Sequence, residues 1–266
     1  MMFRILGPLE IETSAGISIT PWALKQRALL AYLCANNASF VSSRRLLDSL
    51  WADTPPRSAS TALYVYVSKL RKHLKELHID PAILVTVPSG YQLDLPEEYL
   101  DLHLFESRFS QACDLQARGW AEQASDVLNS AIGLWRGQAV EDLRHLPAFD
   151  SIGRRLDERR MLAIERRFEL EISLGRHNVL IGELQSLTEE QPTWETIYGY
   201  LMISLYRSGR TAESLSVFSR IRRVLVDELG IEPGPRLQEI QRAVLTRDAW
   251  LDDIHSPISS SVAFAA

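Results

Sequence analysis

The sequence predicts a mainly helical protein with two domains, the first of three helices with small β-sheets and the second of helices alone. Three observations support this fold class. Residues 58–74 form a helix with two unlike faces, residues 83–95 have the pattern of a β-hairpin, and residues 101–245 show one amphipathic helix after another. At 266 residues the chain is long enough for two buried cores.

The chain begins with short alternating stretches at residues 3–12 and 17–19, which predict the strands of a small sheet. A helix is expected over residues 26–36, and a second over residues 43–51. Ser42 or Ser43 can cap the second helix, because a serine hydroxyl accepts a hydrogen bond from a free backbone N–H of the first turn.

The helix over residues 58–74 carries an apolar seam on one side and polar groups on the other. The seam consists of Leu63, Val67, Leu70 and Leu74. The opposite face consists of Thr61, Val65, Ser68, Lys69 and Lys72. Hydroxyls, branched methyls and cations can contact base edges, thymine methyls and phosphates in a major groove. Seen alone, the helix could equally be an ordinary amphipathic surface helix.

The segment that follows favours DNA binding. Two runs of β-branched and apolar residues flank Pro88-Ser89-Gly90, which is typical of a hairpin. A basic helix followed at once by a hairpin is the order of a winged helix, in which the helix enters the groove and the hairpin lies along the adjacent backbone or minor groove.

These residues resemble a known family of DNA-binding domains. Residues 65–71, Val-Tyr-Val-Ser-Lys-Leu-Arg, are similar to the core of the recognition helix in OmpR-type domains, and Gly90-Tyr91 matches the wing. The sequence departs from the family at the wing tip, where Pro88-Ser89 replace the arginine that many members carry.

The charge is divided unevenly along the chain. The overall net charge is −5, yet the first 95 residues hold ten lysines and arginines against seven acidic residues. The remainder holds 19 basic and 27 acidic residues. A mildly basic module followed by an acidic one fits a nucleic-acid reader coupled to a protein-binding half, although so small an excess could arise by chance.

The second half has the spacing of tetratricopeptide repeats. Gly119, Gly175 and Gly209 each separate two amphipathic helices, and the last two glycines are 34 residues apart, which is the repeat period. Residues 135–151 are an expected insertion between the first helical hairpin and the rest. Such repeats form a helical stack that binds proteins, and a generic helical bundle is the alternative.

This half also resembles a family. Residues 134–137, 174–177, 201–210 and 227–237 are similar to hallmark stretches of the bacterial transcriptional activation domain. That domain follows an OmpR-type domain in the Streptomyces antibiotic regulatory protein family (SARP). The resemblance implies a winged helix at residues 1–97, an activation domain at 98–247 and a flexible tail at 248–266.

The resemblance implies a transcriptional activator. Similar proteins bind direct repeats in promoter DNA as two protomers, recruit RNA polymerase and activate antibiotic biosynthesis genes. We expect a homodimer that assembles on the DNA. The sequence has no Gly-x4-Gly-Lys-Ser/Thr motif, so we expect no nucleotide cofactor, and no metal site.

Further candidate DNA contacts surround the polar face of the helix over residues 58–74. Arg57 and Ser58 lie at the start of this helix, and Tyr64 and Arg71 lie beside its polar face. The candidates on the wing are Thr86, Ser89 and Gly90. Arg71 could contact a phosphate or form a surface salt bridge. Weaker phosphate candidates are Lys25, Arg27, Ser43 and Arg44. Arg220, Arg222 and Arg223 form a basic run that could be solvated or could touch polymerase.

Other functions remain as alternatives. The sequence has no pattern typical of an enzyme, because its six histidines are scattered and no zinc-protease or serine-hydrolase motif occurs. An effector-responsive regulator or repressor could bind a small molecule among Trp120, Trp135, Trp194 and Tyr198. A scaffold that binds protein through the winged helix is a third alternative, which the lysine face disfavours. No signal peptide or membrane span is expected, so the chain should be cytoplasmic.

Overall fold

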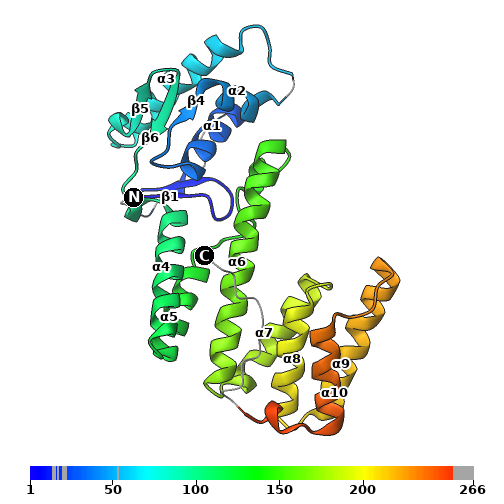
Figure 1. Ribbon diagram of the computed structural model, residues 1–266. Coiled ribbons are helices and arrows are strands. Elements are labelled where there is room, and N and C mark those ends of the chain that lie inside the picture. The colour runs from blue at the N-terminus through cyan, green and yellow to red at the C-terminus, as the bar shows by residue number, and fades with distance from the viewer. Residues whose placement is uncertain (14–15, 17, 20–22, 53, 254–266) are drawn as a thin grey trace. The chain divides into compact units, whose positions relative to one another are not determined.

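The computed structural model describes residues 1–13, 16, 18–19, 23–52 and 54–253, and Figure 1 labels its elements. The protein is mainly helical with small antiparallel sheets near the N-terminus, as the sequence predicts. Contacts divide it into two compact units. The first comprises residues 1–111 with 129–161, and the second comprises residues 112–128 with the chain from 162 onward.

The first unit begins with a three-stranded meander. Its strands are β1 (Met2–Arg4), β2 (Glu10–Glu12) and β3 (Ser18–Ile19), which pair antiparallel in that order. Phe3 lies opposite Ile11, and both side chains are fully buried. This sheet confirms the strands expected from the alternating pattern.

Three helices follow the meander: α1 (Leu24–Ala35), α2 (Ser43–Trp51) and α3 (Ala59–Glu76). Ser42 caps α2, since its Oγ accepts a hydrogen bond from the backbone N–H of Arg45 at 3.3 Å. The three expected helices are therefore confirmed to within two residues at each end.

A second small sheet completes the winged helix. Its strands are β4 (Val41–Ser42), β5 (Leu84–Val87) and β6 (Gly90–Leu93), in the order β4-β6-β5, and a 3₁₀ turn, η1 (Pro81–Ile83), precedes β5. The hairpin confirms the expected wing. The two-residue strand β4 is too short to show a pattern in the sequence.

Helices that follow the wing contribute to both units. They and the intervening 3₁₀ turns are η2 (Glu97–Tyr99), α4 (Asp101–Ala117), α5 (Ala121–Ile132), η3 (Glu141–Leu143) and α6 (Pro147–Ser173). Helix α6 begins inside the segment expected as an insertion, so only residues 133–146 connect α5 to α6.

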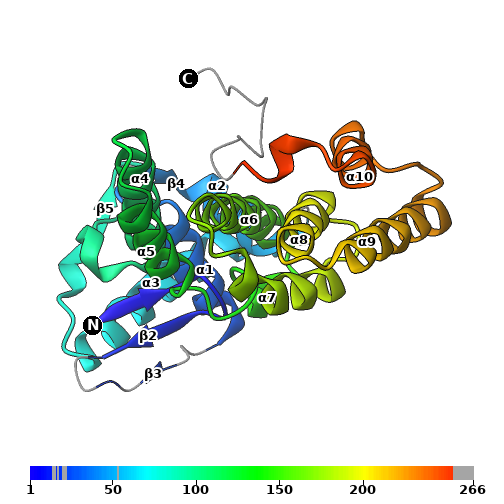
Figure 2. The same cartoon turned by 90° about the horizontal axis from the view of Figure 1, so that it is seen from below.

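The second unit continues as antiparallel helices, visible from yellow to red in Figures 1 and 2. They are α7 (His177–Glu190), α8 (Glu195–Arg207), α9 (Thr211–Val224), the π-helical turn η4 (Leu225–Leu229) and α10 (Pro235–Thr246). Gly119, Gly175 and Gly209 have φ angles of +80°, +74° and +75° at the expected inter-helix turns. These left-handed conformations explain the glycines, which lack the Cβ that would be strained there.

The end of the described chain packs on this unit. A final 3₁₀ turn, η5 (Ala249–Leu251), buries Leu251, and the Arg207 guanidinium donates to the Leu251 carbonyl at 2.6 Å. Residues 249–251, which lie in the segment expected as a tail, thus form a turn that packs on this unit. The remainder of the expected tail, residues 254–266, lies outside the described residues.

Candidate nucleic-acid interface

Helix α3 presents the two faces that its sequence predicts. Ala59, Leu63, Val67, Leu70 and Leu74 are buried. The exposed residues of the opposite face are Thr61, Tyr64, Val65, Ser68, Lys69 and Lys72. We call this set the groove face. Tyr64 is 67% and Val65 44% exposed, so both side chains are available to a partner.

Little holds the lysines of the groove face in the free protein. The Lys72 ammonium lies 3.8 Å from a Glu76 carboxylate oxygen, and both side chains are more than half exposed. Exposed pairs of this kind contribute about 0–1 kcal/mol, so a phosphate can replace the carboxylate at little cost.

The start of α3 also remains open. Arg57 and Ser58 are exposed, and the Ser58 side chain makes no capping bond to the helix. The first turn holds no acidic residue. Free backbone N–H groups and the positive end of the helix dipole therefore coincide with Arg57, which is an arrangement suited to a phosphate.

The wing tip contacts the start of α2. The backbone N–H of Ser43 donates to the Ser89 carbonyl at 2.9 Å, and Ser89 has a φ of +66°. Gly90 is buried and its backbone pairs with β4. As a buried residue without a side chain, it offers little surface to DNA. Arg44 and Arg45 are both exposed in the first turn of α2. Sequence reasoning selected Arg44 and missed Arg45, although the two are adjacent.

Two other candidates from the sequence, Lys25 and Arg27, are half-buried and contact other protein groups. The Lys25 ammonium donates to the Leu50 carbonyl and lies 5.5 Å from the centre of the Trp51 ring. Arg27 forms an ion pair with Asp142. Burial lowers the pKa of both basic groups from their ordinary values. A phosphate would have to compete with these contacts for either residue.

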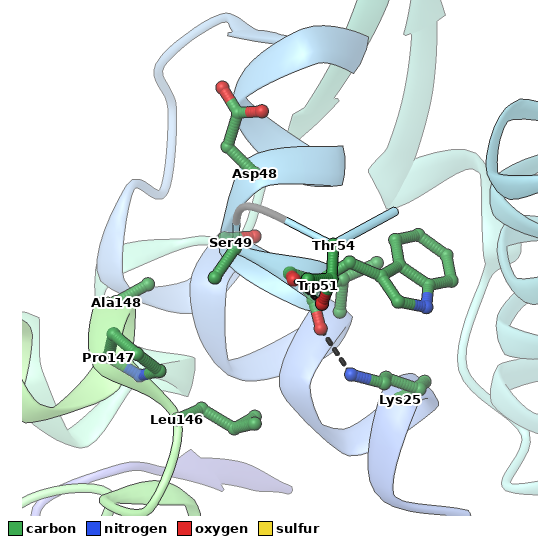
Figure 3. Close-up of a pocket in the computed structure, with 10 residues that line it drawn as sticks. Lys25, Asp48, Ser49, Trp51, Thr54, Leu146, Pro147 and Ala148 are labelled. Atoms are coloured by element: carbon green, nitrogen blue, oxygen red, sulfur yellow. Dashed lines mark hydrogen bonds between the residues drawn. The ribbon is translucent and has the colours of Figure 1, made fainter. Parts of the chain in front are cut away.

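Lys25 borders a small cavity of the first unit, about 210 Å³ in volume. Figure 3 shows the bond from Lys25 as a dashed line, with Asp48 and Trp51 from α2 and Pro147 from α6 around the same space. Trp51 also stacks on Tyr66 at 6.0 Å between ring centres, so Tyr66 is a packing residue.

The aromatic residues considered for an effector pocket lie elsewhere. Trp135 packs edge-on against Phe105 at 5.4 Å, and the Tyr198 hydroxyl donates to the Thr188 carbonyl at 3.1 Å. The Trp194 indole N–H donates to a Glu165 carboxylate at 2.7 Å. Trp120 is half exposed. None of the four lines the cavity.

The basic run on α9 is partly engaged within the second unit. Arg222 makes a bidentate pair with Glu232, at 2.6 and 2.7 Å, and Arg220 donates to the Thr188 hydroxyl at 2.9 Å. These partners weaken the interpretation of the run as a polymerase contact.

A polar network that sequence reasoning missed joins the segment between β1 and β2 to the start of α4 and to the α5–α6 connection. The Asp101 carboxylate accepts hydrogen bonds from the backbone N–H groups of Ile5 and Leu6 at 2.9–3.0 Å. Arg136 donates to the Pro8 carbonyl at 2.9 Å, and Asp142 accepts from the Leu9 N–H at 2.9 Å. The partners are 95 to 133 residues apart, so no local pattern could indicate them.

No group of three or more histidines, cysteines or acidic residues that could hold a metal occurs in the part of the chain that the structure describes. Within that part, no helix is long and apolar enough to cross a membrane.

Comparison with known proteins agrees with this geometry. Residues 20–93 match the family model for "transcriptional regulatory protein, C terminal", and residues 100–245 match the model for "bacterial transcriptional activator domain". Regulatory protein DnrI of Streptomyces peucetius is 36% identical over 273 residues, covering 100% of both chains. Regulatory protein AfsR of Streptomyces coelicolor is 35% identical over 96% of this chain and 25% of its own length.

A solved structure shows the same architecture. Transcriptional regulatory protein EmbR of Mycobacterium tuberculosis is 36% identical over 91% of this chain. Its structure with a low-affinity phosphopeptide has a TM-score of 0.86 and covers 92% of this chain. This chain spans all of DnrI but only 63% of the length of EmbR.

Proposed function

This chain belongs to the Streptomyces antibiotic regulatory protein family of transcriptional regulators, and we propose that it is a pathway-specific activator of an antibiotic or other secondary-metabolite gene cluster. It binds direct repeats at promoters through the winged helix and recruits RNA polymerase through the helices that follow. Two protomers assemble on the DNA, in the cytoplasm, without a cofactor.

The groove face carries this proposal. One exposed surface of α3 combines two lysines, three hydroxyls and an exposed valine, while the other side of the helix is buried in the core. Lysines attract the phosphate backbone irrespective of sequence, whereas hydroxyls and methyls distinguish base edges. Arg57, Ser58, Arg44 and Arg45 extend the charge to both ends of the contact.

The proposed domains assign a role to each part. Residues 1–97 form the DNA-binding domain and residues 98–247 the activation domain, with residues 248–266 beyond them. Within the second domain, Arg220 is the weaker candidate for a polymerase contact, because its guanidinium donates to the part-buried Thr188 hydroxyl.

Selection of duplexes from a random library, followed by footprinting, tests the DNA-binding part of this proposal. The expected footprint covers two equally spaced copies of one sequence in the same orientation, and sedimentation shows monomers without DNA and two protomers per duplex. Binding to all duplexes with equal affinity would contradict it.

Run-off transcription with purified polymerase tests activation. The selected repeats are placed upstream of a promoter, and the full chain is expected to raise transcript yield. A Lys69→Ala/Lys72→Ala variant should fail to do so. If the wild-type chain lowers the yield, the protein is a repressor instead.

A further inference from the structure

The wing lacks the charge with which a hairpin could hold DNA by itself. No lysine or arginine occurs in residues 80–95. Its position relative to the groove face must therefore be set by contacts within the protein. Two of these contacts lie at the tip and along β5.

At the tip, the wing is fixed to the start of α2. The Ser43 N–H binds the Ser89 carbonyl, as described above, and β6 approaches β4 so closely that a Cβ on Gly90 would lie 2.2 Å from the Val41 carbonyl oxygen. This end of the hairpin is consequently held by backbone groups of α2 and β4.

Along β5, the wing is fixed to the recognition helix by Arg71. One guanidinium nitrogen, Nη2, donates to the Leu84 carbonyl at 2.6 Å and to the Thr86 hydroxyl at 2.7 Å. Both acceptors belong to β5, and Arg71 follows the buried Leu70 in α3. In this arrangement Arg71 binds neutral acceptors of the wing.

We propose that Arg71 is a positioning residue that sets the wing against the groove face, and that the Arg71–Thr86 bond contributes to DNA affinity through the placement of the wing. This inference rests on the proposed function. Charge-assisted hydrogen bonds to neutral acceptors are stronger than neutral ones, so the bond can fix β5 in place. Lysine is a poor substitute, because its side chain is shorter and its ammonium lacks the planar geometry of the guanidinium.

Four variants of the full chain test the inference: Arg71→Ala, Arg71→Lys, Thr86→Val and the double variant Arg71→Lys/Thr86→Val. Two controls match their chemistry on other surfaces. Arg155→Ala removes an exposed arginine from α6, and Thr246→Val removes an exposed hydroxyl from α10. The probe is a duplex selected from a random library, titrated at several salt concentrations.

We expect Thr86→Val to weaken binding by about tenfold and Arg71→Lys to weaken it by at least as much. The double variant should bind no more weakly than Arg71→Lys alone, because that variant already lacks the Arg71–Thr86 bond that Thr86→Val removes. The slope of log affinity against log salt should stay unchanged in Thr86→Val and in both Arg71 variants. If Arg71 contacted a phosphate, the magnitude of the slope would instead fall by about 0.9 in Arg71→Ala. It would not fall in Arg71→Lys, which keeps the charge. The proposal would be overturned if Arg71→Ala reduced the magnitude of the slope while Thr86→Val left the affinity unchanged.

Amide hydrogen exchange of the free protein separates this inference from the proposed function. Exchange across residues 84–93 should become faster in Arg71→Ala and Thr86→Val but not in the controls. If the wild-type chain binds no duplex, the proposed function fails while the exchange still decides the role of Arg71. Unchanged exchange in both variants would overturn that role as well.

Discussion

Asp101 shows how much a single buried charge can matter in this protein. Its side chain is 1% exposed at the start of α4, and its carboxylate accepts backbone hydrogen bonds from Ile5 and Leu6. Burial raises the pKa of Asp101 from 3.8 to about 6, although these hydrogen bonds and the charge of Arg136 act in the opposite direction. The residue therefore makes stability depend on pH.

The sign of that dependence follows from the raised pKa. The folded protein binds the Asp101 proton more tightly than the unfolded chain does, so this contribution is fully present below pH 3.8 and is lost as pH rises through about 6. The loss is about 3 kcal/mol. Urea unfolding of wild type and Asp101→Asn between pH 4 and 7 measures it. The wild type should lose stability relative to the variant as pH rises, and parallel curves would contradict this assignment.

At the scale of elements, the wing depends on a close approach between strands. A Cβ on Gly90 would lie 2.2 Å from the Val41 carbonyl oxygen and 2.9 Å from the Ser42 Cα, both of which are backbone atoms. Strand β4 must move to admit any side chain. Gly182 on the exposed side of α7 is the opposite case, because a Cβ there would meet nothing within 4 Å.

We therefore expect Gly90→Ala to destabilise the protein by about 1–3 kcal/mol and to weaken DNA binding, because it displaces the wing from α2. Gly182→Ala should stabilise it by about 0.5–1 kcal/mol, because alanine favours the helix. Urea unfolding of both variants checks these values. Equal stability of the two variants would show that β4 and β6 are not in close contact.

The same scale shows what the sequence could predict. The faces of α3, the hairpin and the turn glycines depend on residues within one element, and periodicity indicated all of them. The partners of Lys25, Arg27 and Arg71 could not be predicted. Arg27 meets Asp142, which is 115 positions away, and Arg71 meets β5 only after the hairpin has folded back on α3. Tertiary contacts decided these roles.

At the scale of the whole molecule, the winged helix is not an isolated module. Asp142, in the connection between α5 and α6, pairs with Arg27 of α1 and accepts the Leu9 N–H. The side chains of Asp142 and Arg27 are 17% and 20% exposed. All of these residues belong to the first unit, which includes the start of α6. Part of the chain matched by the activator-domain model thus supports the DNA-binding elements.

Asp142→Ala should therefore destabilise the first unit by about 2–4 kcal/mol, because it leaves Arg27 and the Leu9 N–H without their acceptor. Asp150→Ala is the matched control, since Asp150 pairs with Arg154 on an exposed face of α6. That variant should change stability by less than about 0.5 kcal/mol. Hydrogen exchange of the α1 and β2 amides measures the effect. Equal protection in the two variants would contradict it.

Salt-dependent binding of a selected duplex tests the central claim, that the groove face of α3 binds DNA. The comparison is between wild type, Lys69→Ala/Lys72→Ala, and a control with the same loss of charge, Arg155→Ala/Arg223→Ala, in which both arginines are exposed. We expect the lysine variant to lose about 1.8 from the slope of log affinity against log salt, together with most of its affinity, and the control to resemble wild type. Equal binding by wild type and the lysine variant would contradict the claim, because the DNA would then contact another surface of the protein.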